Sequence, residues 1–97
     1  MNIKKIETRK QWTPKEWDQV IALYMEFLLH QLNGEKYTKA KPVRELAEKL
    51  GRSKGSIECL MMNLSAIRSD NGSNTWVKGY KPLSNYNKAL KDHFDNY

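Results

Sequence analysis

The chain has 97 residues, which is enough for one domain with a modest hydrophobic core and leaves no room for a second. It carries 17 Lys and Arg against 11 Asp and Glu, and the net charge of +6 favours a polyanionic partner such as nucleic acid, although many small soluble proteins are also basic. The single cysteine, Cys59, excludes an intrachain disulfide, no apolar run is long enough to cross a bilayer, and both features predict a cytoplasmic protein without a membrane partner.

Residues 1–10 are polar and basic and show little hydrophobic period. Against one acidic residue, Glu7, this segment carries Lys4, Lys5, Arg9 and Lys10. We therefore predict a flexible basic arm at residues 1–10 and a single folded domain at residues 11–97. The arm could lie along phosphates, or it could be only a solvated tail.

A strong helix start follows the arm. Thr13 can cap the helix, Pro14 suits its first turn, and Glu16 completes a capping box, while Trp12 and Trp17 have the spacing of a hydrophobic staple. A wide apolar stripe continues along the same helix: Val20, Ile21, Tyr24, Phe27, Leu28 and Leu32. The Asn-Gly pair at 33 and 34 ends this helix, which is the longest in the chain and the expected structural spine.

The next stretch, residues 35–41, is dense in lysine and has no helical period, and Pro42 marks the first turn of another helix. Basic residues therefore cluster at the start of this second helix: Lys36, Lys39, Lys41 and Arg44. We expect them to contact DNA phosphates, because the pair of helices that follows has the outline of a DNA-binding motif whose first helix begins near the DNA backbone.

That outline covers residues 43–63, which predict two helices joined by a tight turn. Gly51 suits the turn because glycine enters the left-handed region without strain, and Ser53 can cap the second helix. Apolar residues recur on one face of each helix: Val43, Leu46, Ala47 and Leu50 in the first, and Ile57, Leu60, Met61 and Leu64 in the second. The pattern is that of a helix-turn-helix, with Ala47 as the small residue that allows close approach.

The second helix of the pair is the candidate recognition helix, yet the side chains on its outward face are mostly small or apolar and carry no charge. The residues able to contact bases or phosphates are Arg52, Ser53, Lys54, Ser56 and Asn63. On the same face, Cys59 and Met62 offer only apolar contact, which suits a pyrimidine methyl group. Alternatively, Cys59 and Met62 belong to the core and Asn63 ties the helix to neighbouring backbone; for Asn63 this structural role is the favoured one.

After this helix, which we expect to reach Ile67, the polar stretch at residues 69–74 predicts a turn. Residues 75–80 have the composition of a short strand, so a two-stranded wing could bring Lys78 and Lys81 to the DNA. A plain covering loop with Trp76 in the core is an equal alternative. A last helix, capped by Ser84 or Asn85, would then place four apolar residues on one face: Tyr86, Ala89, Leu90 and Phe94.

Sequence patterns for catalysis are missing. His30 and His93 are far apart and have no neighbours at metal-ligand spacing, and Cys59 has no obvious base beside it. No glycine-rich phosphate loop, serine elbow or paired-carboxylate motif is found. We therefore expect neither an enzyme nor a bound cofactor or metal.

The chain resembles the N-terminal domain that precedes HNH nuclease domains in McrA-like, modification-dependent restriction endonucleases. The matching features are the helix start at Trp12, Thr13 and Glu16, the Ala-Leu-Tyr run at residues 22–24, and the Gly-Arg-Ser-x-Gly-Ser-Ile run at residues 51–57 followed by Asn63. In the family pattern a lysine follows that isoleucine by three residues, where this chain has Leu60. The resemblance implies a DNA-binding module, in some relatives one that senses modified cytosine, without the nuclease half.

From these observations we predict a mainly α, winged helix-turn-helix domain with four helices and a short β-hairpin. It would bind double-stranded DNA in restriction or phage defence, as a stand-alone protein or beside a nuclease domain. One alternative is a small phage or mobile-element protein that binds and inhibits a host protein. Another is a small transcription regulator, for which a homodimer would be expected.

Overall fold

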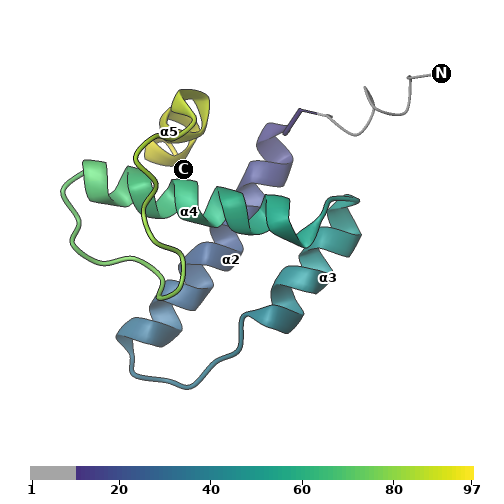
Figure 1. Ribbon diagram of the computed structural model, residues 1–97, viewed down its shortest axis with the longest axis horizontal. Coiled ribbons are helices and arrows are strands. Elements are labelled where there is room, and N and C mark those ends of the chain that lie inside the picture. Colours follow the sequence, from purple (N-terminus) through teal and green to yellow (C-terminus); the bar gives the residue numbers. More distant parts are fainter. Residues whose placement is uncertain (1–10) are drawn as a thin grey trace.

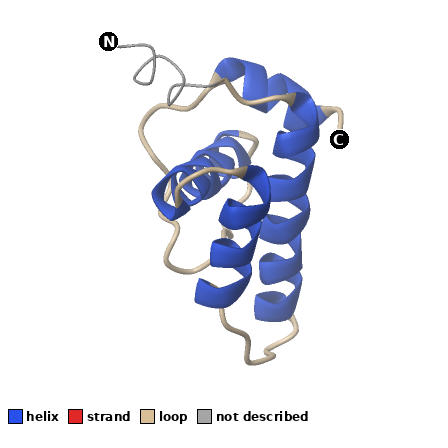
Figure 2. Cartoon of the chain, turned by 90° about the vertical axis from the view of Figure 1, so that its right-hand side faces the viewer, coloured by secondary structure: helices blue, strands red, loops and turns tan. Residues whose placement is uncertain are grey.

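The computed structural model describes residues 11–97 and folds them into four helices (Figure 1). These are α2 (Pro14–Leu32), α3 (Ala40–Leu50), α4 (Lys54–Asp70) and α5 (Lys88–Asp95). Figure 2 shows helices and connecting loops only, and residues 11–97 contain no strand. The mainly α prediction is thus confirmed. The predicted arm at residues 1–10 lies outside the described residues, and within residues 11–97 no helix is long and apolar enough to cross a membrane.

Helix α2 begins where the sequence predicts. The Thr13 hydroxyl accepts a hydrogen bond from the Glu16 amide at 3.2 Å, and the Glu16 carboxylate accepts one from the Thr13 amide at 3.0 Å, so the capping box is complete. The helix ends at Leu32, before Asn33 and Gly34, also as predicted. Reciprocal capping satisfies two amides at the helix start that would otherwise have no partner.

The predicted turn between α3 and α4 is present. Gly51 has φ 67° and ψ 35°, the left-handed conformation that closes a helix, and the Arg52 amide donates to the Ala47 carbonyl at 2.9 Å. Ser53 then caps α4 by accepting from the Ser56 amide at 3.1 Å. Helices α3 and α4 are therefore linked by three residues, with a defined geometry at each side of the turn.

Helix α4, rather than α2, is the most enclosed element. Four consecutive residues in its second half are buried, namely Leu64, Ser65, Ala66 and Ile67, and a helix can bury such a run only when it is covered on several sides. In Figure 1, α2 passes behind α4, while α3 and α5 lie near opposite ends of α4. Ser65 is the one buried polar residue in the described chain, and its hydroxyl lies 2.7 Å from the Tyr24 hydroxyl of α2.

The segment between α4 and α5, residues 71–87, is a covering loop and not the predicted hairpin. Val77 and Tyr80 are its buried side chains, whereas Trp76 is only half-buried, so the expectation of Trp76 in the core is wrong. The loop is held by α2: Gln31 donates to the Trp76 carbonyl at 2.9 Å and accepts from the Lys78 amide at 2.8 Å. Side chains of α2 thus supply hydrogen bonds that a second strand would otherwise provide.

The last helix begins later than predicted. Asn87 caps α5 by accepting hydrogen bonds from the Ala89 and Leu90 amides at 2.8 and 3.1 Å, so neither Ser84 nor Asn85 is the cap. Leu90 is buried and Ala89 is exposed, which corrects the predicted apolar face at that residue.

Candidate nucleic-acid interface

Apart from its last two residues, Ser69 and Asp70, the exposed surface of α4 lies in its first half. Lys54, Gly55 and Cys59 are exposed there, and Glu58 is half-buried. Further along, Met62 is half-buried and packs against the core, and Ala66, which lies on the same side of the helix as Cys59, is buried. Apart from Ser69 and Asp70, the exposed side of α4 therefore spans about two turns.

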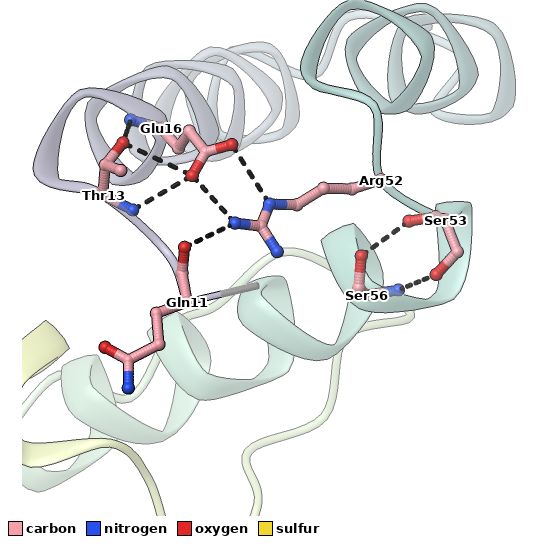
Figure 3. A network of polar contacts seen from close by, with 6 residues as sticks. All are labelled: Gln11, Thr13, Glu16, Arg52, Ser53 and Ser56. Atoms are coloured by element: carbon pink, nitrogen blue, oxygen red, sulfur yellow. Dashed lines mark hydrogen bonds and ion pairs between the residues drawn. The ribbon is translucent and has the colours of Figure 1, made fainter. Parts of the chain in front are cut away.

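The two serines predicted as contacts hold the start of α4. In addition to the Ser53 cap, the Ser56 hydroxyl donates to the Ser53 carbonyl at 2.8 Å (Figure 3). Both hydroxyl groups are thus occupied by the helix terminus. Their main role in the structure is to fix the backbone from which Lys54 projects.

Arg52, also predicted as a DNA contact, is turned inward. Its guanidinium donates to both carboxylate oxygens of Glu16 at 2.9 and 3.1 Å and to the Gln11 carbonyl at 2.8 Å (Figure 3). It also lies over the Trp12 ring, 3.9 Å from its centroid, and the Arg52 side chain is only 9% exposed. This arginine joins the α3–α4 turn to the start of α2 instead of facing a groove of DNA.

The electrostatics of this contact agree with its geometry. Hydrogen bonding from the Arg52 guanidinium lowers the pKa of Glu16 from its usual 4.5 to about 2, against the opposing effect of desolvation, and the Thr13 amide adds to the lowering. Glu16 is therefore ionised at neutral pH, and a paired charge holds the turn before α4 against the first turn of α2.

Asn63 is engaged at both ends of its side chain. Its amide group donates to the Cys59 carbonyl at 2.8 Å, and its side-chain oxygen accepts from the Asn87 amide at 3.0 Å. Asn63 thus links the middle of α4 to the residue that caps α5. This arrangement is the structural alternative that the sequence favoured for Asn63.

The remaining predicted contacts are basic residues on α3, on α4 and in the loop between α4 and α5. Lys41, Arg44, Lys54, Lys78 and Lys81 are exposed. At 100° per residue, Arg44 falls on the flank of α3 opposite to Pro42, Leu46 and Lys49, and these three line a groove shared with α2. Arg44 is therefore turned away from that groove.

Lys39 fixes the covering loop to the start of α3. Its ammonium group donates to the Lys78 carbonyl and lies 5.0 Å from the centroid of the Tyr80 ring. The contact depends on glycine between those residues, because a Cβ at Gly79 would lie 2.7 Å from the Lys39 ammonium nitrogen. Lys78 is consequently tied through its carbonyl to Lys39, the residue that precedes α3.

Two residues that organise this region could not be assigned from sequence. Gln31 holds the loop, and Glu16 holds Arg52 from 36 residues away. The local sequence predicted that Glu16 caps α2. Its ion pair with Arg52 could not be predicted, because no local pattern indicates a partner so distant in sequence.

Within residues 11–97, no group of three or more His, Cys, Asp and Glu residues is arranged to hold a metal ion. Compared with protein-family models, curated proteins and solved structures, the chain matches none of them.

Proposed function

We propose that this domain binds double-stranded DNA as a helix-turn-helix, with the first half of α4 in the major groove. The observation that carries the proposal is the α3–turn–α4 pair, in which the start of α4 has an exposed outer side, together with the exposed basic residues of α3, α4 and the loop. An α-helix fits the major groove of B-DNA, and the N-terminal residues of such a helix are those that reach the bases.

The exposed charged residues indicate which parts of the domain would contact the DNA backbone. Arg44 and Lys41 on α3, and Lys78 and Lys81 on the loop, are long exposed cations suited to phosphate oxygens. The loop takes the place of a wing without forming strands. Lys54 is the basic residue on the exposed half of α4, while the nearby Glu58 opposes DNA. Affinity would thus come mainly from the backbone and depend strongly on salt.

Sensitivity to modified cytosine is the finer part of the proposal. Cys59 is exposed on the outward face of α4 and offers a small apolar surface, which suits the 5-methyl group of a pyrimidine. The resemblance to modification-dependent restriction endonucleases supports the same role. Binding to matched duplexes with plain and 5-methylated cytosine tests it: we expect tighter binding to the methylated duplex, and equal binding would leave a general DNA-binding domain.

Lys49 gives a matched control for the DNA proposal because it lies on α3, like Arg44, but lines the groove with α2. The experiment titrates random-sequence duplex DNA at low and moderate salt with the unmodified chain, Arg44→Glu and Lys49→Glu. Removing a phosphate contact changes the log-log salt slope by about 0.9. We expect Arg44→Glu to weaken binding about tenfold more than Lys49→Glu does. Equal effects, or no binding at either salt, would reject the proposed surface.

A protein partner is the second candidate function, and a separate surface favours it. The groove between α2 and α3 is lined by Ala22, Leu23 and Leu46 together with polar side chains, and Leu29, about two turns beyond Ala22 on α2, is 59% exposed. A groove with apolar side chains and a large exposed leucine on the same helix would suit a protein partner. Light scattering of the chain alone, and of Leu29→Lys, tests self-association: a mass above the monomer that Leu29→Lys abolishes would support this candidate, and a monomer in both would oppose a homodimer.

A further inference from the structure

Glu58 differs from every other acidic residue within residues 11–97. It lies on the first half of α4 and is half-buried, and no hydrogen bond or ion pair in that part of the chain engages its carboxylate. Every other acidic residue there is exposed except Glu16, which Arg52 holds. Withdrawing a carboxylate from water without a partner costs free energy. The contacts of the fold therefore give no reason for a carboxylate at this position.

The charges near Glu58 place it on one flank of α4. Burial is the main cause that raises the pKa of Tyr80 to about 12, and the negative charge of Glu58 is the next, so Glu58 lies near the covering loop. Lys54 is one turn earlier on α4, about 40° away around the helix axis, and no ion pair joins it to Glu58 in the described residues. A cation and an anion, each without an ion-pair partner, are thus neighbours on this flank.

Gly55 leaves the backbone of α4 bare beside Glu58, since residues three apart are neighbours on a helix surface. Gly55 does not have a positive φ, and a Cβ added to it would meet nothing within 4 Å. Alanine would stabilise the helix more than glycine does. Glycine also allows another molecule to approach the backbone closely. The fold does not require glycine here, whereas a molecule bound against α4 would benefit from it.

We propose that Glu58 selects cytosine, by accepting a hydrogen bond from the N4 amino group of that base in the major groove. Lys54 donates to the N7 or O6 atom of a neighbouring guanine, and Gly55 lets the helix approach the base edges. This inference rests on the proposed DNA-binding function and names the base pair that α4 prefers. The N4 amino group is present in plain and 5-methylated cytosine alike, so this contact does not depend on 5-methylation.

The chemistry of the base edges favours cytosine over the other bases. In the major groove cytosine presents only a donor, and guanine presents only acceptors. Adenine also has an amino group, but its N7 acceptor lies beside it and repels a carboxylate, and thymine presents an acceptor and a methyl group. A lysine next to a glutamate is therefore complementary to a G·C pair.

The first test is competition between two duplexes of equal length, one of alternating G and C and one of alternating A and T. We expect the unmodified chain to prefer the G·C duplex at least about fivefold, and Glu58→Gln to prefer it less than about twofold, since glutamine pairs with adenine. Glu45→Gln is the control, because it makes the same charge change in the groove between α2 and α3 and should keep the preference.

A Glu58 that only repels phosphates would give a different result. Glu58→Gln would then strengthen binding to both duplexes equally, and that outcome would overturn the inference. Binding of the unmodified chain to both duplexes without preference would also overturn it and would leave the proposed function in place. Failure to bind any duplex would overturn the proposed function together with this inference, so the two failures are distinguishable.

The second test removes the donor from the DNA. Methylation of cytosine at N4 keeps the base pair but replaces the amino hydrogen that points into the major groove. We expect N4-methylation of the G·C duplex to weaken binding of the unmodified chain at least about fivefold and binding of Glu58→Gln less than about twofold. Equal losses in the two proteins would show that the methyl group acts without Glu58 and would overturn the inference.

Gly55→Ala tests the close approach, and its two expected effects have opposite signs. The substitution should raise the Tm by about 2 to 8 °C, because alanine favours the helix. It should weaken binding to the G·C duplex about threefold to tenfold, because the new methyl group holds the helix away from the bases. Unchanged or tighter binding would contradict the close approach on which the Glu58 contact depends.

Folding of each variant is checked by circular dichroism. If Glu58→Gln does not fold, Glu58→Asp replaces it, because the shorter side chain keeps the charge but withdraws the carboxylate from the base. We then expect Glu58→Asp to lose the preference for the G·C duplex. A preference retained in Glu58→Asp would mean that charge alone matters, and it would overturn the inference.

Discussion

The two halves of α4 differ in what covers them. From Lys54 to Cys59 the outer side of the helix is open, apart from the half-buried Glu58, and small side chains lie there. From Leu64 to Ile67 the helix is buried all round, with a serine enclosed among the apolar residues. One helix therefore serves as the centre of the fold at one end and as a free surface at the other.

The residues of α4 that stabilise the fold are therefore largely separate from those that could contact another molecule. Substitutions in the buried second half should act on folding, and substitutions on the exposed outer side of the first half should act on contacts with other molecules. Regular spacing along a helix therefore cannot by itself identify a recognition face. Met62 and Ala66 continue the outward spacing of Gly55 and Cys59, but Met62 is half-buried against the core and Ala66 is buried.

The largest contrast is expected between Ile67→Ala and Cys59→Ala. Ile67 is completely buried, so its truncation leaves a cavity and should lower the free energy of unfolding by about 2 to 5 kcal/mol. Cys59 is exposed, and its replacement should change that free energy by less than about 0.5 kcal/mol. Urea denaturation measures both. Similar losses for the two variants would show that the halves of α4 do not differ as described.

The buried hydroxyl pair under the second half gives the next effect. Tyr24 is hydrogen bonded to Ser65 at 2.7 Å and accepts from the Val77 amide at 3.2 Å, so Tyr24→Phe leaves two buried polar groups without this partner. We expect a loss of about 1 to 3 kcal/mol in the free energy of unfolding. Tyr86→Phe is the control, since the Tyr86 hydroxyl donates to Asp70 at the surface at 2.6 Å. An equal loss in the control would contradict this account.

The contact that holds the start of α4 should depend on pH. The folded-state pKa of Glu16, about 2, lies below its usual 4.5, so the stability it contributes is present above pH 4.5 and is lost as the pH falls towards 2. We expect this contribution to be about 1 to 2 kcal/mol, because solvent screening reduces what the pKa shift alone would imply. Thermal unfolding of the native chain should become easier over this range, and Glu16→Gln should flatten the dependence. An identical pH profile in the variant would reject this role of the Glu16–Arg52 pair.

The smallest effect concerns Asn63 and DNA. Since both ends of its side chain are used within the fold, Asn63→Ala should cost about 1 kcal/mol of stability and change DNA affinity by less than about twofold. Lys54→Ala should have the opposite profile, with unchanged stability and weaker binding. Fluorescence anisotropy with a labelled duplex measures the affinities. A tenfold loss in folded Asn63→Ala would instead make Asn63 a direct contact.

Local patterns in the sequence predicted much of this fold. The capping box at Thr13 and Glu16, the left-handed Gly51 and the Ser53 cap depend on residues a few positions apart, and all are present. The loop could not be predicted in the same way, because Gln31 and Lys39 reach it from other elements. For the candidate site, the sequence proposed Lys54 and Arg44 as DNA contacts and both are exposed, whereas the inward turn of Arg52 depends on Glu16, 36 residues away.

The central claim is that the first half of α4 contacts DNA, and Cys59 reports on it directly. It is the only cysteine in the chain, and it is exposed on the outward face of that half. The measurement is the rate at which a neutral maleimide alkylates the unmodified chain, with and without saturating duplex DNA. We predict that DNA slows alkylation at least about tenfold, because the major groove would cover the thiol. An unchanged rate, while anisotropy shows the complex to be formed, would contradict the claim.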